Sequence, residues 1–141
     1  MQVVVKKFNE LTVDELYEIL KIRVNIFVVE QNCPYLEIDD IDKEAYHVYI
    51  KDDSGILAYL RVYAKDGVRI GRVLSVKRRQ GFGSAVMLEG IRVARERLGA
   101  SKILIEAQTY AKAMYEKLGF VQTSEEFLED GIEHIKMELS I

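Results

Sequence analysis

The stretch KRRQGFGSAVMLEG, residues 77–90, joins three cations to a helix that opens on two glycines. The cations occupy positions 77–79, the glycines are Gly81 and Gly83, and the first acid is Glu89. The N-terminal end of a helix carries a partial positive charge and normally attracts acidic side chains. Cations at this end are unfavourable unless an anion joins them, so the stretch predicts an anion site on the backbone N–H groups of the helix start.

Length and composition limit the class of protein. The 141 residues are 49% apolar and 30% charged, with a formal net charge of −3. These values predict one globular domain over residues 1–141. The acidic balance and the lack of a second basic cluster disfavour a nucleic-acid partner, which needs a broad basic face. A small anionic ligand therefore fits the basic helix start better than a polymer does.

Cys33 is the single cysteine, so the sequence excludes an intrachain disulfide. The N-terminus lacks the apolar core of a signal peptide and no segment has the length of a membrane span, so we expect a cytoplasmic protein without a membrane partner. No metal is expected, because Asp39, Asp40 and Asp42 lack the spacing of a calcium loop and two distant histidines do not make a zinc site. Residues 32–44 are instead predicted to form an acidic loop, solvated or attractive to a cationic amine.

Periodicity and turn residues predict the order β α β β β α β α β β. Alternation predicts strands at 2–8, 46–52, 55–65, 68–76, 102–108 and 133–140. A capping box, Thr12 with Glu15, starts the first helix, and Pro34 marks its latest possible end. Helical spacing predicts a second helix over 84–98, closed by Gly99, and a short one within 109–120. The crossover from Arg69 to Gln108 predicts two neighbouring parallel strands at the centre of the sheet.

Two familiar phosphate-binding motifs do not fit the glycine stretch. A Walker loop needs Gly-Lys-Ser/Thr, which is absent, and a dinucleotide fingerprint needs a third glycine where Val86 stands. Hairpins rather than a βαβ unit precede the stretch, which also disfavours a dinucleotide site. A merely solvated basic loop stays open as an alternative. The remaining pattern is Arg-x-x-Gly-x-Gly, filled by Arg78, Gly81 and Gly83.

This pattern, after a strand and at a helix start, resembles the pyrophosphate-binding motif of the GNAT superfamily of N-acetyltransferases. A second hallmark of that superfamily, a short helix with Tyr before Glu-x-x-Gly-Phe, is similar to MYEKLGF at 114–120. NIFVVEQNCPY at 25–35 and LEDGIEHIKM at 128–137 resemble the narrower ElaA-like branch, so the resemblance covers nearly the whole chain. It implies an α/β (α+β) fold with a mixed, mostly antiparallel sheet, one central parallel strand pair, and helices on both faces.

The resemblance also implies a donor, acetyl-CoA, and an amine acceptor, either a small molecule or a peptide. The pyrophosphate would lie on the helix start and the pantetheine arm along the preceding strand. Gln108 stands where many superfamily members carry Asn. The predicted donor-binding residues are Leu74, Ser75, Val76, Lys77, Arg78, Arg79, Gln80, Gly81, Phe82, Gly83, Ser84 and Gln108. By the same resemblance, Tyr115 is the candidate acid that protonates the departing thiolate, with packing of its helix as the alternative role.

The base that takes the proton of the amine is less well defined. Glu30 and Glu106 are the candidates, and Glu106 has a structural ion pair as its alternative role. Gln31, His47 and His134 are expected on the substrate side, although each histidine could equally be a buried structural residue. A non-catalytic acyl-CoA-binding or regulatory module on the same fold is the alternative to an enzyme. The sequence identifies neither the acceptor amine nor the oligomeric state.

Overall fold

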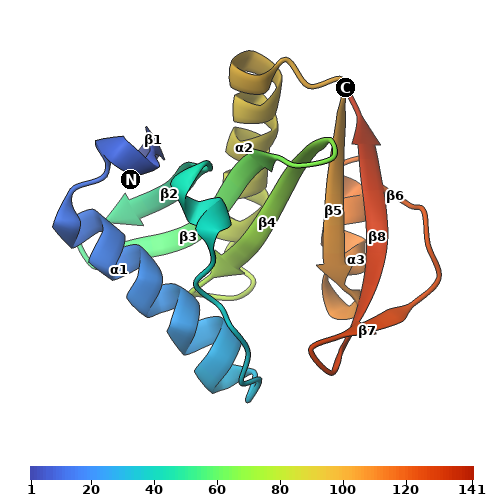
Figure 1. Ribbon diagram of the computed structural model, residues 1–141, viewed down its shortest axis with the longest axis horizontal. Coiled ribbons are helices and arrows are strands. Elements are labelled where there is room, and N and C mark those ends of the chain that lie inside the picture. Colours follow the sequence, from blue (N-terminus) through green and yellow to red (C-terminus); the bar gives the residue numbers. More distant parts are fainter.

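The computed structural model describes residues 1–141 and contains one eight-stranded sheet with three α-helices (Figure 1). The strands are β1 (Gln2–Lys7), β2 (Tyr46–Asp52), β3 (Gly55–Ala64), β4 (Val68–Ser75), β5 (Lys102–Gln108), β6 (Val121–Gln122), β7 (Phe127–Glu129) and β8 (Ile132–Ser140). The helices are α1 (Val13–Val24), α2 (Phe82–Leu98) and α3 (Lys112–Lys117). Short 3-10 turns are η1 (Phe8–Glu10), η3 (Asp40–Lys43) and η4 (Thr109–Ala111), and η2 (Asn25–Glu30) is a π-helix.

The strand order is β1-β2-β3-β4-β5-β8-β6, with β7 paired to β8 outside this path. Every neighbouring pair is antiparallel except β4 and β5, which α2 connects. This confirms the predicted mixed sheet with one central parallel pair. The predicted penultimate strand is instead divided into the short strands β6 and β7.

Helices cover both faces of the sheet, as the sequence predicted. On one face, α2 and α3 pack against the larger hydrophobic core, which includes Met87, Ile103 and Met137. On the other face, α1 packs over β1–β4 through a smaller core that includes Ile19, Phe27 and Tyr59. Because α1 covers only the first four strands, the same face of β5 and β8 carries no helix (Figure 1).

Local signals place the helix ends where they were predicted. The Thr12 hydroxyl accepts from the Glu15 N–H, and the Glu15 carboxylate accepts from the Thr12 N–H, so the predicted capping box begins α1. The helix continues as the π-helix η2 and ends before Pro34. Gly99 closes α2 in the left-handed conformation, with φ of 61°.

The parallel pair opens into a gap. Only Val68 pairs with Ile103 and Arg69 with Leu104, so the ladder ends well before either strand does. Figure 1 shows β4 and β5 close at their N-terminal ends and apart at their C-terminal ends. Between Tyr59 and Arg61 the β3–β4 register shifts, so β4 contains one extra residue, a β-bulge that bends it.

Candidate functional site

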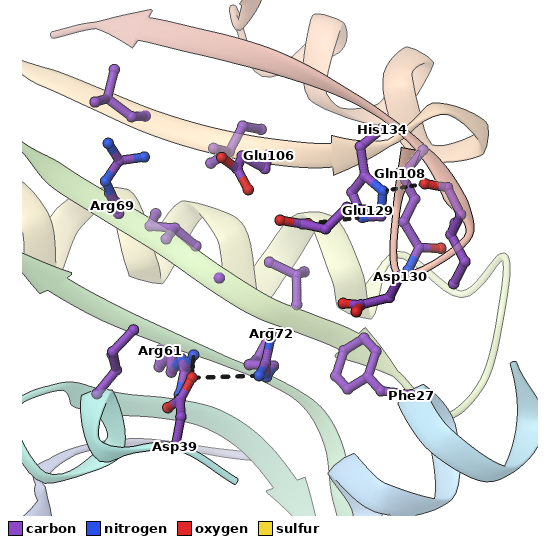
Figure 2. Close-up of a pocket in the computed structure, with 18 of the residues that line it drawn as sticks. Phe27, Asp39, Arg61, Arg69, Arg72, Glu106, Gln108, Glu129, Asp130 and His134 are labelled. Carbon is purple, nitrogen blue, oxygen red and sulfur yellow. Dashed lines mark hydrogen bonds and ion pairs between the residues drawn. The ribbon is translucent and has the colours of Figure 1, made fainter. Parts of the chain in front are cut away.

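A cleft of about 660 Å³ lies at this gap, a volume typical of small-molecule sites. Its walls come from β3 and β4 on one side and from β5, β7 and β8 on the other, and the segment after α1 closes one end. Figure 2 shows charged side chains from both walls directed into the cleft, among them Arg69, Arg72, Glu106 and Glu129. Five residues predicted for the site line it: Gln31, Glu106, Gln108, Tyr115 and His134.

The backbone of β4 beside the gap has free hydrogen-bonding groups. The Val76 N–H donates to the Leu57 carbonyl at 2.9 Å, so Val76 faces β3. Because successive residues of a strand point to opposite neighbours, Ser75 directs its N–H and C=O groups toward β5, and Val73 lies in the bulge beside the same gap. That side of β4 has no strand partner past Arg69. Of the predicted stretch Leu74–Val76, only Ser75 is therefore free to pair with an added chain.

The start of α2 carries the features that the sequence predicted for an anion site. Gly81 is its N-cap in the left-handed conformation, with φ of 80°, and no side chain caps the first turn. No acid lies in that turn, and residues 77–80 are exposed. The N–H groups of residues 82–84 thus lack a capping side chain. None of residues 77–84 lines the cleft, so the helix start and the cleft are two separate parts of the candidate site, joined by the end of β4.

Two contacts join the segment after α1 to the second half of the chain across the cleft. The Gln31 and Gln108 side-chain amides donate to each other's carbonyl oxygen at 3.2 Å. The Cys33 thiol donates to the Asp130 carbonyl at 3.2 Å. These contacts hold the segment after α1 against the wall of β5, β7 and β8 and give Cys33 a structural role.

Tyr115 on α3 reaches the cleft from the opposite face of the sheet. It is buried in the larger core, packs edge-on against Phe120 with ring centroids 5.8 Å apart, and also lines the cleft. Burial, followed by the nearby Tyr110, raises the pKa of Tyr115 well above its usual value. Its hydroxyl is therefore protonated at neutral pH and can donate a proton.

Glu106, Glu129 and His134 form a titratable group on the wall opposite β4. Burial raises the pKa of Glu129, and a hydrogen bond to Glu106 together with the charge of Glu106 raises it further. His134 is 8% exposed; its Nδ1–H donates to the Ile132 carbonyl at 2.7 Å, and its Nε2 lies 3.5 Å from Glu129 Oε2. The two carboxyl groups and the imidazole can accept and pass on a proton inside the cleft.

Two other predicted residues, the substrate-side His47 and the candidate base Glu30, lie apart from the cleft. His47 on β2 is fully buried, and three strands separate β2 from the strand of His134, so the structure does not bring the histidines together. The Asp42 carbonyl can only accept, so His47 Nε2–H donates to it at 2.8 Å and Nδ1 accepts from the Tyr59 hydroxyl at 2.7 Å. Glu30 is exposed at the end of η2 and does not line the cleft.

The acidic loop is not solvated as predicted, because three of its carboxylates pair with buried arginines. Arg23 of α1 binds Asp42 through two hydrogen bonds of 2.7 and 3.2 Å, and Arg61 of β3 binds Asp39 through two of 2.7 and 3.0 Å. Glu37 accepts from Arg23 at 3.1 Å, and its Oε1 has no partner. These carboxylates are neutralised within the protein, so they do not attract a cationic amine.

Arg72 connects this ion-pair network to the β4 bulge. It has a left-handed backbone with φ of 53°, which is uncommon for a residue with a side chain. Its Nε lies 2.6 Å from Glu37 Oε2, its Nη2 donates to the Glu37 carbonyl at 2.8 Å, and its guanidinium lies over the Tyr35 ring. The network thereby holds the bulge that shapes the cleft wall.

Sequence reasoning missed Tyr63, Arg69, Arg72, Glu129 and Asp130, which all line the cleft. A partial signal existed for Tyr63, since it alternates with apolar residues in YLRVYAK and so shares a strand face with Arg61. For Arg23, the signal of burial was its place four residues after Ile19 and four before Phe27, on the apolar side of the first helix. Nothing local indicates Glu129, which reaches the cleft through the pairing of β7 with β8.

Comparisons with known proteins agree over the whole length. Residues 21–141 match the family model described as an acetyltransferase (GNAT) domain. A UPF0039 protein of Schizosaccharomyces pombe is 38% identical and is matched over 98% of its length by 100% of this chain. The crystal structure of an acyl-CoA N-acyltransferase from Pseudomonas aeruginosa has a TM-score of 0.92 at 35% identity, and that of Escherichia coli ElaA 0.94 at 30%. Each structural match covers 99% of this chain and 100% of the other.

Proposed function

Because this chain belongs to the GNAT acetyltransferase family, we propose that it transfers an acetyl group from acetyl-CoA to a primary amine by direct attack of the amine on the thioester. The observation that carries the proposal is the gap between β4 and β5, which leads from the uncapped start of α2 to the cleft. The acceptor is a small molecule or the amine of a peptide.

The donor is assigned to the helix start and the edge of β4. The N–H groups of residues 82–84 and the left-handed Gly81 offer a concave, positively polarised surface to the pyrophosphate. Residues 77–80 add exposed counter-charge from Lys77, Arg78 and Arg79, beside Gln80. Ser75 and Val73 pair with the amides of the pantetheine arm, and this arm thereby takes the place of a strand between β4 and β5. Gln108, held by Gln31, lies at the far side of the gap.

The acceptor is assigned to the open face of β5 and β8. An ammonium has no lone pair, so it must lose a proton before attack, and Glu106 with Glu129 accepts that proton. His134 lies behind Glu129 and can take the proton onward. Glu30 stays a candidate base only if the segment after α1 moves inward, because its side chain is exposed outside the cleft.

The transfer itself requires two further groups. The amine nitrogen forms a bond to the thioester carbon, and the oxygen of that carbon becomes an oxyanion, for which the Val73 N–H at the bulge is the candidate donor. The carbon–sulfur bond then breaks, and the thiolate takes a proton from Tyr115. The second amine proton leaves with the collapse of the intermediate and restores the tyrosine.

Thiol release from acetyl-CoA, measured across a panel of primary amines with mass spectrometry of the products, tests the proposed function. We expect at least one amine to gain one acetyl group per thiol released. Binding of acetyl-CoA without transfer to any amine would instead favour a non-catalytic acyl-CoA-binding module.

A further inference from the structure

Arginines gather on one wall of the cleft and carboxylates on the other, although the β3–β4 turn also adds Lys65 and Asp66 to the arginine side. The wall of β5, β7 and β8 contributes Glu106, Glu129 and Asp130. The wall of β3 and β4 contributes basic residues, of which Arg61 and Arg72 are already paired with carboxylates of the ion-pair network. Arg69 belongs to this basic wall and lies outside the network. The cleft is therefore bipolar, negative on one side and positive on the other.

Arg69 is oriented by the protein but not neutralised by it. Its Nε–H donates to the Lys65 carbonyl at 2.7 Å, and its Nη2 donates to the Asp66 carbonyl at 3.3 Å. It forms no ion pair with a carboxylate, and the remaining N–H groups of its guanidinium have no protein acceptor. A guanidinium fixed in this way presents its charge and free donors to whatever occupies the cleft (Figure 2).

The register places this free cation at a short distance from the opposite wall. Arg69 pairs with Leu104, and Glu106 follows two residues further on the same face of β5. With a strand rise of about 3.3 Å and a strand separation of about 4.8 Å at the last pair, the Cα atoms of Arg69 and Glu106 are at least about 8 Å apart, because the strands separate beyond that pair. Tyr63 of β3 pairs with Arg69 and also lines the cleft beside it.

We propose that the acceptor is an amino carboxylate: Arg69 binds its carboxylate, and its amine lies against Glu106 and Glu129. This inference rests on the proposed function and names the substrate class of the same site. The separation of the two walls suits a compound in which a few bonds join the amine to the carboxylate. A free amino acid, or a peptide whose reacting amine is near its C-terminus, has this form.

The same geometry discriminates against other amines. A carboxylate facing Arg69 forms charge-assisted hydrogen bonds, which are worth about 10- to 100-fold in affinity. An amine without a carboxylate forgoes these bonds. A diamine of similar length places a second positive charge against Arg69, which is repulsive. The acidic wall alone would favour a diamine, so the two substrate classes give opposite results.

The experiment compares matched substrates with the wild type and with Arg69→Gln. The probes are the common α-amino acids, β-alanine and 4-aminobutyrate, each beside its carboxamide and its decarboxylated amine, with short C-terminal peptides and their amides. We expect at least one carboxylate to exceed its carboxamide about tenfold or more in kcat/KM. Arg69→Gln should lower kcat/KM for that carboxylate at least tenfold. The kcat/KM for the matching carboxamide should stay within about twofold of the wild-type value. Arg95→Gln, an exposed site on α2, is the matched control and should change neither value.

Two kinds of failure are distinguishable. The inference would be overturned if kcat/KM for carboxamides and simple amines equalled or exceeded that for carboxylates. The proposed function would still stand. An equal loss for both substrate types in Arg69→Gln would also overturn the inference, provided that acetyl-CoA affinity and circular dichroism match the wild type. The absence of transfer to every amine would remove both the inference and the proposed function.

Discussion

Tyr115 packs in the core and also faces the cleft, and one substitution separates these roles. Tyr115→Phe keeps the ring against Phe120 and removes only the hydroxyl, for which the protein offers no hydrogen-bond partner. We expect kcat to fall about 100-fold or more while acetyl-CoA affinity and stability stay close to the wild type. Tyr17→Phe, at a side chain on α1 that is 68% exposed and outside the cleft, is the control. An unchanged kcat would leave Tyr115 with packing alone.

At the scale of elements, the start of α2 predicts opposite effects of one change on stability and on binding. Ser84 occupies the third helical position, where a carboxylate interacts well with the helix dipole. Ser84→Glu should therefore stabilise the protein by roughly 0.3–1 kcal/mol in urea unfolding. The same carboxylate would repel the pyrophosphate and weaken acetyl-CoA binding, by at least about tenfold at low salt.

Calorimetric titration with acetyl-CoA measures the second effect, and Ser101→Glu, an exposed site before β5, serves as the control. Unchanged affinity in Ser84→Glu would exclude the α2 start as the pyrophosphate site.

The ion-pair network joins α1 to β3 and β4 through the segment between them. Arg23→Met would leave Asp42 paired with Arg61 alone and Glu37 with Arg72 alone, so we expect a loss of about 1.5–3 kcal/mol in the free energy of unfolding. Lys21→Met, an exposed site on the same helix, is the control. A loss below about 1 kcal/mol would mean that the arginine adds little to holding these elements together.

Local sequence signals predicted individual elements well. The capping box at Thr12 and the left-handed Gly99 fixed helix ends, because each is a backbone requirement met by neighbouring residues. The gap between β4 and β5, the left-handed Arg72 and the pairing of Arg23 with Asp42 were not predictable, because each depends on residues far apart in the chain. For the same reason only part of the cleft lining was predicted: Tyr115 came from a family pattern and Glu106 from its place at the end of the strand after the crossover, whereas Arg69 and Glu129 required the register.

For the whole molecule, buried titratable groups predict a loss of stability in acid in two steps. Burial lowers the pKa of His47 below 6.5, so its neutral form stabilises the fold above that pH, and this contribution is lost as the pH falls. Burial raises the pKa of Glu15, but hydrogen bonds from Thr12, Lys6 and Tyr49 outweigh the effect of burial. Together they bring the pKa of Glu15 to about 2. Glu15 therefore adds a second loss between pH 4.5 and 2.

Thermal unfolding from pH 8 to 3 should show both steps, and His47→Gln should remove the first one. Glu129 acts in the opposite direction, since its raised pKa favours the protonated form, and Glu129→Gln separates its contribution. Stability that stays constant between pH 7 and 5 would contradict the assignment of His47 as a buried neutral residue.

None of the protein's helices has both the length and the apolarity needed to cross a bilayer. Gln31 with Gln108 and Cys33 with Asp130 hold the segment after α1 against the wall of β5, β7 and β8, beside the open β4–β5 gap.

An NMR titration of the ¹⁵N-labelled protein with acetyl-CoA would show whether the donor lies in the β4–β5 gap with its pyrophosphate on α2. The backbone amide signals of Val73, Ser75 and residues 82–84 should shift most and saturate together. Saturation of signals elsewhere, with these amides unchanged, would contradict this placement of the donor.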